Sequence, residues 1–143
     1  NAGNRGFNTI SRYERADYVC LNGAEVMLEM RVREGDTKDL VKQLSQGISC
    51  KKFTVTLGRS GMVQYDEHHG YFDAPALALN VADRVGAGDA VLAITSPMVA
   101  LGMPWEWVGL LGNLAGAEAV AELGNKRILK LGNLIKHAQS ILS

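Results

Sequence analysis

The chain has 143 residues, of which 15 are basic and 15 acidic, and 47% are hydrophobic. This length is enough for one domain with a sizeable core, and the composition is typical of a soluble globular protein. The balanced charge gives no indication of a nucleic-acid partner or of an anionic membrane surface as partner.

The cysteines and the apolar stretches bear on the compartment. Cys20 and Cys50 lack the spacing of a metal site, which favours reduced thiols. No signal peptide is visible, and the most apolar stretch, residues 90–103, is too short to span a bilayer. We therefore expect a cytoplasmic protein with no membrane partner.

Strand patterns and helix patterns alternate in the first half of the chain. Asn22 is a candidate N-cap for one helix, and Asp36 or Thr37 for the next. The apolar face of that second helix is Leu40, Val41, Leu44 and Ile48. In chain order we expect a loop over 1–8, a short helix at 9–15, a strand at 17–21, helices at 25–31 and from 37 onwards, a strand at 53–57, a hairpin over 62–72 with its tip at 66–69, and a strand at 77–81.

The second half of the chain is helical. We expect helices over residues 88–101, 104–123 and 131–142, with Gly102 ending the first and Pro104 starting the second. Strands that alternate with helices and then give way to helices predict one α/β domain with a mainly parallel sheet.

The segment Asp83–Asp89 is the most informative part of the sequence. The small residues Gly86, Ala87 and Gly88 can bring backbone N–H groups close to a ligand, and the helix that follows directs its positive end to the same point. This predicts a phosphate site. Asp89 fits there if it accepts a proton from an attacking hydroxyl, which indicates phosphoryl transfer. The alternative is a tight strand-to-helix turn in which Asp89 only favours the helix dipole.

Two weaker patterns follow the predicted strands. The segment Thr56–Gly61 leaves a strand through two glycines, at the carboxyl edge where α/β sheets bind ligands, and nucleotide phosphates could lie over it. Alone it is equally consistent with a hairpin turn. Asn22 and Glu25 follow the strand at 17–21, and a helix cap is the favoured interpretation; a Mg²⁺ ion held through water by Glu25 is the alternative.

The remaining candidates favour structural roles. Asn113 lies on a small-residue face that indicates close helix packing, formed by Gly109, Gly112, Gly116 and Ala119. His68 and His69 have no partner ligands near them in sequence, so we expect an exposed turn and no metal site. Packing is the expected role of Trp105 and Trp107.

Three motifs, taken together, resemble a known family. Asp83–Asp89 resembles the Asp-Thr-x-Gly-Ala-Gly-Asp signature of the ribokinase-like (PfkB) carbohydrate kinases. Asn22–Glu25 resembles the family's Asn-x-x-Glu motif and Thr56–Gly61 its Thr-x-Gly-x-x-Gly nucleotide loop, in the family order. The resemblance covers essentially all 143 residues. It implies a ribokinase-like three-layer α/β sandwich and an ATP-dependent kinase that phosphorylates a sugar or sugar phosphate.

The resemblance also implies roles for single residues. Asp89 would be the general base. The other roles would be an anion hole at Gly86, Ala87 and Gly88, an ATP site at Thr56, Gly58 and Gly61 with Asn113 next to the adenine, Mg²⁺ and phosphates organised by Asn22 and Glu25, and a monovalent cation such as K⁺ near Asp83.

The chain departs from the family pattern at several points. Arg84 replaces the usual threonine, which bears on the cation site, and Val91 and Leu92 replace an aromatic and a small residue. The family's N-terminal half, which carries the lid and most sugar contacts, has no counterpart in this sequence. We therefore expect residues 1–143 to be the nucleotide-binding and catalytic half, and we expect any homodimer to form through the other half. The segment Asn4–Asn8 resembles the heptose-phosphate kinase subgroup.

Two other functions stay open. One is a non-catalytic module that senses or assembles with an adenine nucleotide, which Arg84 and the absent half favour. The other is a nucleoside or vitamin kinase of the same superfamily, because the choice of acceptor depends on the absent half.

Overall fold

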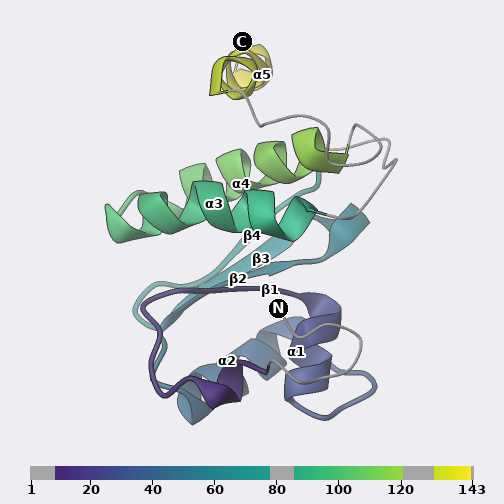
Figure 1. The fold of residues 1–143 in the computed structure, drawn as a ribbon, viewed down its shortest axis with the longest axis vertical. Helices are drawn as coiled ribbons and strands as arrows, with labels where there is room; N and C mark the ends of the chain where they lie inside the picture. The colour runs from purple at the N-terminus through teal and green to yellow at the C-terminus, as the bar shows by residue number, and fades with distance from the viewer. Residues whose placement is uncertain (1–8, 78–85, 121–130, 143) are drawn as a thin grey trace.

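The protein forms three layers in the computed structural model, which describes residues 9–77, 86–120 and 131–142 (Figure 1). Helices α1 and α2 cover one face of a four-stranded sheet, and α3 and α4 cover the other, with α5 beyond α4. No helix in these ranges is both long and apolar enough to cross a membrane. The elements are η1 (Ile10–Arg12), β1 (Val19–Asn22), α1 (Gly23–Glu29), α2 (Thr37–Gly47), β2 (Lys52–Thr56), η2 (Gly58–Ser60), β3 (Met62–Asp66), β4 (Gly70–Ala74), α3 (Ala87–Ala100), α4 (Trp105–Val120) and α5 (Leu131–Leu142).

The sheet is mixed, which corrects the expectation of a mainly parallel one. Its order is β1-β2-β3-β4, where β1 and β2 are parallel and the two other pairs are antiparallel. The connections explain the difference. The helix α2 provides the long crossover that a parallel pair needs, whereas residues 57–61 and 67–69 are too few for a crossover and produce antiparallel neighbours.

Most of the predicted elements are confirmed, with ends shifted by one or two residues. The α/β class, the three layers, the hairpin and the three late helices are all present. The expected helix at 9–15 is only the 3-10 turn η1, and Leu77 belongs to no strand. The predictions for residues 1–8, 78–81 and 121–123 lie outside the described residues.

The two helix starts that the sequence marked are capped as expected. Asn22 accepts from the Glu25 amide at 2.9 Å, and the Glu25 carboxylate accepts from the Asn22 amide at 2.9 Å, which together form a capping box. Asp36 accepts from the amides of Lys38 and Asp39 and so caps α2. Helix α2 then buries Leu40, Val41 and Leu44 against side chains of β1 and β2, in the core between the sheet and the α1–α2 layer.

Helices α3 and α4 pack closely because α4 carries glycines where they meet. A Cβ atom on Gly112 would lie 2.9 Å from the Thr95 methyl group, and one on Gly116 would lie 3.2 Å from a Val91 methyl group. Gly109 allows the same approach to the sheet, where a Cβ would lie 2.8 Å from Ala74. The predicted role of this small-residue face in helix packing is thus confirmed.

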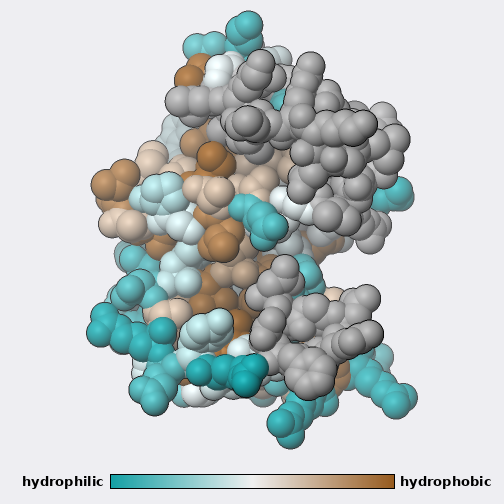
Figure 2. All heavy atoms as spheres, in the orientation of Figure 1, coloured by the Kyte–Doolittle hydropathy of each residue, from teal (hydrophilic) through white to brown (hydrophobic). Residues whose placement is uncertain are grey.

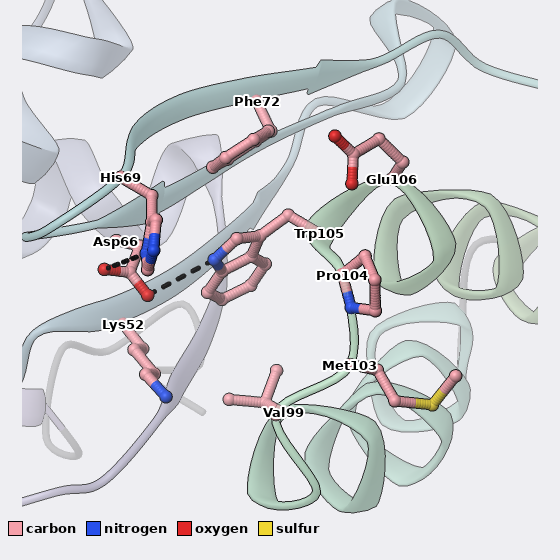
Figure 3. Close-up of a pocket in the computed structure, with 10 residues that line it drawn as sticks. Lys52, Asp66, His69, Phe72, Val99, Met103, Pro104, Trp105 and Glu106 are labelled. Atoms are coloured by element: carbon pink, nitrogen blue, oxygen red, sulfur yellow. Dashed lines mark hydrogen bonds and ion pairs between the residues drawn. The ribbon is translucent and has the colours of Figure 1, made fainter.

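A buried carboxylate joins the β3–β4 hairpin to the start of α4. Asp66 accepts a hydrogen bond from the Trp105 indole at 3.2 Å and pairs with His69 at 3.2 Å (Figure 3). Its other donor is the His68 amide at 2.8 Å. Burial opposes ionisation, but these donors together hold the pKa of Asp66 below its usual value. His69 itself lies in the exposed turn that the sequence predicted.

Removal of the indole donor should destabilise the fold in a pH-dependent way. Trp105→Phe leaves a buried carboxylate with one donor fewer, so we expect a loss of about 1–3 kcal/mol in the free energy of unfolding at neutral pH. A carboxyl group whose pKa is lowered by folding stabilises above its unfolded pKa of about 3.9, and this stabilisation is lost as the pH falls through the folded value. The difference between wild type and variant should therefore shrink below about pH 4 in chemical denaturation experiments.

The matched control is Trp107→Phe, on the same helix turn. Trp107 is 42% exposed, whereas Trp105 is 8% exposed. Equal losses for the two variants, or a Trp105→Phe loss that does not change with pH, would contradict a stabilising role of the Asp66–Trp105 bond.

Candidate active site at the carboxyl edge of the sheet

The carboxyl ends of β1 and β2 meet at one edge of the sheet. Asn22 and Thr56 are the last residues of these two parallel strands and are direct partners in the register. The Thr56 hydroxyl donates to the Leu21 carbonyl at 3.5 Å, which ties the two strand ends together. Two of the three sequence motifs therefore begin side by side.

Within the described residues, helix α3 begins without a side-chain cap. Its N-cap is Gly86, which has φ +87° and no side chain to accept from the first-turn amides. The earliest helical bond of α3 is from the Ala90 amide to the Gly86 carbonyl, at 3.0 Å. The amides of Ala87, Gly88 and Asp89 precede it, so the start of the helix offers N–H groups and a positive dipole end to an anion.

The start of α3 lies against the end of β1. Burial, together with the negative charges of Glu25 and Asp89, raises the pKa of the Cys20 thiol to about 12. Both carboxylates are thus close enough to Cys20, in the middle of β1, to act on its charge. Asp89 is solvent-exposed and is not folded into the interior. The structure therefore brings Asn22, Glu25, Thr56 and Asp89 to the same edge.

The Asn22–Glu25 pair has the structural role that the sequence favoured. The capping box uses one side-chain oxygen of each residue. It also fixes the Glu25 carboxylate at the end of β1, next to the start of α3. A metal held there through water would use a carboxylate whose position the fold already determines.

The loop Leu57–Gly61 is a compact turn that needs its glycines. Gly58 has φ +60° and Gly61 has φ +86°, and the Leu57 amide donates to the Gly61 carbonyl at 2.8 Å. A Cβ atom on Gly61 would lie 2.1 Å from the Ala74 carbonyl oxygen. The loop therefore rests directly on the segment that follows β4.

Asn113 holds this same segment from the other side. Its side-chain amide donates to the Ala74 carbonyl at 3.2 Å and to the Pro75 carbonyl at 3.0 Å. A cavity of about 480 Å³ opens beside it, and its apolar part includes Phe72, Leu77 and Leu110. The sequence indicated Asn113 as a packing residue or a ligand neighbour. In the structure it both binds the segment that follows β4 and lines this cavity.

A second cavity, of about 410 Å³, lies at the other end of α3. Val99, Met103, Trp105, Lys52 and the Asp66–His69 pair line it (Figure 3). Val99 is ten residues from Asp89, which is about 15 Å along the helix. This cavity therefore belongs to the amino edge of the sheet and not to the site at Asp89.

Two further residues that the sequence singled out, Asp83 and Arg84, lie outside the described residues. Within the described part of the chain, no group of three or more histidine, cysteine, aspartate or glutamate side chains has the arrangement of a metal site. Mg²⁺ commonly takes water and phosphate oxygens together with only one or two carboxylates.

Sequence reasoning missed the buried polar contacts beneath the site. Tyr18 donates to the Thr95 hydroxyl at 2.8 Å, which links the segment before β1 to the middle of α3. The alternation of Tyr18 and Cys20 with Val19 and Leu21 is the signal that could have indicated it. Val19 and Leu21 are apolar and face the α1–α2 layer, which leaves the other two for the α3 side.

Comparison with known proteins gives a consistent result. The family model described as "pfkB family carbohydrate kinase" matches residues 7–129. A curated relative, the bifunctional protein HldE of Koribacter versatilis, is 35% identical over 117 residues, which are 80% of this chain and 24% of the relative. The chain thus spans about a quarter of the length of the curated relatives it matches.

Solved structures show the same fold. Phosphofructokinase-2 from Escherichia coli, in a complex with potassium, superposes with a TM-score of 0.79 at 17% identity, covering 93% of this chain and 43% of that one. Adenosine kinase from Sinorhizobium meliloti gives a TM-score of 0.76 at 25% identity, covering 90% and 39%.

The two loop glycines should differ in their tolerance of a side chain. Gly58→Ala and Gly61→Ala both place alanine at positive φ, which costs roughly 1–3 kcal/mol, and the ψ of −130° at Gly61 adds to the strain there. Only Gly61→Ala adds a clash, because the Gly58 position has open space around it. We expect a clearly larger fall in Tm for Gly61→Ala, measured by thermal denaturation. Equal falls would show that the loop does not rest on the Ala74 carbonyl as described.

Proposed function

Because the chain belongs to the pfkB family of carbohydrate kinases, we propose that it is the nucleotide-binding and catalytic part of an ATP-dependent sugar kinase. In this proposal the γ-phosphoryl group of ATP passes to a hydroxyl group of the acceptor. One observation carries the proposal. An exposed carboxylate, Asp89, lies in the first turn of α3, whose N-cap Gly86 has no capping side chain, at the sheet edge that also holds Glu25 and Thr56.

Asp89 is the general base in this mechanism. The acceptor hydroxyl loses its proton to the Asp89 carboxylate while its oxygen forms a bond to the γ-phosphorus. The bond between the γ-phosphorus and the bridging oxygen breaks, and ADP leaves with that electron pair. The first-turn amides of α3, from Ala87 and Gly88 and the Asp89 residue itself, act as the anion hole and stabilise charge on the transferring group.

ATP has room along the same edge. Its phosphates lie over the loop from Thr56 through Gly58 to Gly61, next to the end of β1. The adenine enters the cavity beside Asn113. The segment after β4 lies between this cavity and the loop, since it contacts both Asn113 and Gly61. The apolar side chains of that cavity suit a flat base, and its volume of about 480 Å³ is in the usual range for small-molecule pockets.

Mg²⁺ fits the donors at this edge. A magnesium ion retains several waters and takes few carboxylates together with substrate phosphates, so the single fixed carboxylate of Glu25 and the side chain of Asn22 are sufficient on the protein side. When bound, the ion neutralises phosphate charge. A monovalent cation such as K⁺ would need Asp83, which lies outside the described residues.

The acceptor is a sugar or sugar phosphate in this proposal. The resemblance of the segment Asn4–Asn8 to heptose-phosphate kinases favours a sugar phosphate. Hydrophobic residues gather at the level of the sheet on the face shown in Figure 2, and Leu92 on α3 is 42% exposed. We propose that the remainder of the kinase, with the lid and any dimer interface, lies against this face.

Asp89→Asn should reduce kcat of the full-length kinase by about 100- to 10,000-fold, because the amide cannot accept the proton. A coupled ADP-release assay over a panel of sugars and sugar phosphates measures it. The matched control is Asp39→Asn, because Asp39 is exposed and holds the same first-turn position in α2. Near-normal turnover in Asp89→Asn would refute the mechanism.

Calorimetry with ATP and ADP separates the kinase from a nucleotide sensor. The kinase proposal predicts binding of both nucleotides together with turnover of at least one acceptor. Binding without turnover of any acceptor in the full-length protein would favour the sensor. Turnover of a nucleoside or vitamin, and of no sugar, would show that the protein is a nucleoside or vitamin kinase of the same superfamily.

Glu25→Gln should raise the Mg²⁺ concentration needed for half-maximal activity without loss of the fold. Glutamine can keep the capping-box bond to the Asn22 amide, but it removes the negative charge. We expect a change in the Mg²⁺ dependence of the rate and a Tm close to that of wild type. An unchanged Mg²⁺ dependence would leave Glu25 as a helix cap only.

A further inference from the structure

The segment from Tyr18 to Cys20, which leads into β1, faces α3 through side chains that the proposed chemistry does not use. Val19 and Leu21 belong to the core on the α1–α2 side, so the alternate side chains, Tyr18 and Cys20, lie on the α3 side. Tyr18 packs there against the cluster that contains Met98 and Trp105. Its position is therefore beneath the site, inside the layer between the sheet and α3.

Tyr18 is bonded to α3 through Thr95. The phenol donates to the Thr95 hydroxyl at 2.8 Å, and that hydroxyl donates in turn to the Val91 carbonyl at 2.8 Å. Burial raises the pKa of Tyr18, so the phenol stays protonated and remains a donor. Among the described residues this is the one side-chain hydrogen bond between the segment 18–22 and α3.

Thr95 is held on two sides. It is fully buried, with its hydroxyl group toward Tyr18 and its methyl group 2.9 Å from the position that a Cβ atom on Gly112 would take. A shift of α3 along its axis would break the first contact and force the second against α4. Two contacts of different kinds therefore fix one position of the helix along β1.

The position of Thr95 determines the position of Asp89. The two residues are six positions apart in one continuous helix, which is about 9 Å along the axis. At the Asp89 end the helix lies near Cys20, and at the Thr95 end it lies at Tyr18, so α3 runs opposite to β1. A displacement at Thr95 would move Asp89 and its neighbouring amides relative to Asn22 and the strand ends.

We propose that Tyr18 is a positioning residue: its hydrogen bond to Thr95 sets where Asp89 and the first-turn amides of α3 stand relative to the end of β1. The inference rests on the proposed kinase function for its effect on rate. It does not depend on that function for its effect on the helix.

The test compares Tyr18→Phe with Tyr71→Phe in the full-length kinase. Each substitution removes one phenol hydroxyl that donates one hydrogen bond, and the Tyr71 hydroxyl donates to the Lys38 carbonyl at 2.7 Å on the opposite face of the sheet. Because Tyr71 also lines the cavity proposed for the adenine, kcat of the variants is compared at saturating ATP. Tyr18→Phe leaves Thr95 its hydrogen bond to the Val91 carbonyl, but it also removes the hydroxyl next to the side chain of Cys20 and the buried side chain of Thr54. We expect kcat to fall at least about tenfold in Tyr18→Phe only, because a misplacement of about 1 Å can cost that much. The KM for ATP should stay near the wild-type value, since the loop Leu57–Gly61 is on other strands.

Thr95→Ser supplies the conservative rescue. Serine keeps the acceptor for Tyr18 but removes the methyl group, so its Tm should fall while kcat stays close to that of wild type. A fall in kcat that follows the fall in Tm across Tyr18→Phe, Tyr71→Phe and Thr95→Ser would overturn the inference, because it would reduce Tyr18 to a general contributor to stability.

Hydrogen exchange separates this inference from the proposed function. The amide of Ala90 donates to Gly86 in the first turn of α3, so it reports the order of that turn. We expect faster exchange at this turn in Tyr18→Phe than in Tyr71→Phe. This difference would support the role of Tyr18 even if wild-type protein showed no kinase activity with any acceptor. Equal exchange in the two variants would overturn it.

Discussion

The glycine at the start of α3 is the constraint on which the site depends. Gly86 has no side chain with which to cap the first-turn amides, and no described side chain caps them, so they are suited to bind an anion. The chain places this start above the ends of two parallel strands, where Glu25 and Thr56 also lie. An exposed carboxylate, Asp89, stands in the same turn. A positive helix end and a carboxylate are both useful at one point when an alcohol must lose a proton and gain a phosphoryl group.

The position of this helix is set by its packing and not by its own sequence preferences. Glycine in a helix costs about 0.5–1 kcal/mol relative to alanine, and α4 accepts this cost at Gly109, Gly112 and Gly116. In return α3 comes close enough for Thr95 and Val91 to fill the space that the missing Cβ atoms leave. The Tyr18–Thr95 bond then fixes the helix along β1. Packing far from the chemistry thereby determines the geometry at Asp89.

Local signals in the sequence were sufficient for most elements and for the outline of the site. Asn22 and Asp36 indicate helix starts because their side chains can cap first-turn amides. Gly86, Gly88 and Gly102 indicate where α3 begins and ends. The sheet was harder to predict, since strand direction depends on the length of each connection and on which strands pair. The burial of Asp66 was also hidden, because an aspartate before two histidines is typical of a turn, and its partner Trp105 lies 39 residues away. The Tyr18–Thr95 contact spans 77 residues, so the alternation around Tyr18 indicates which face its side chain occupies but not which residue it contacts.

The most direct test of the account follows the backbone amides at the start of α3. Aluminium fluoride with ADP stands in for the transferring phosphoryl group, so its addition to the full-length protein with an acceptor and Mg²⁺ should move the amide resonances of Ala87, Gly88 and Asp89 in ¹H–¹⁵N spectra. ADP and Mg²⁺ alone should shift mainly the loop from Leu57 to Gly61. Shifts that leave the first turn of α3 unchanged, or that gather around the cavity at Trp105, would contradict the account.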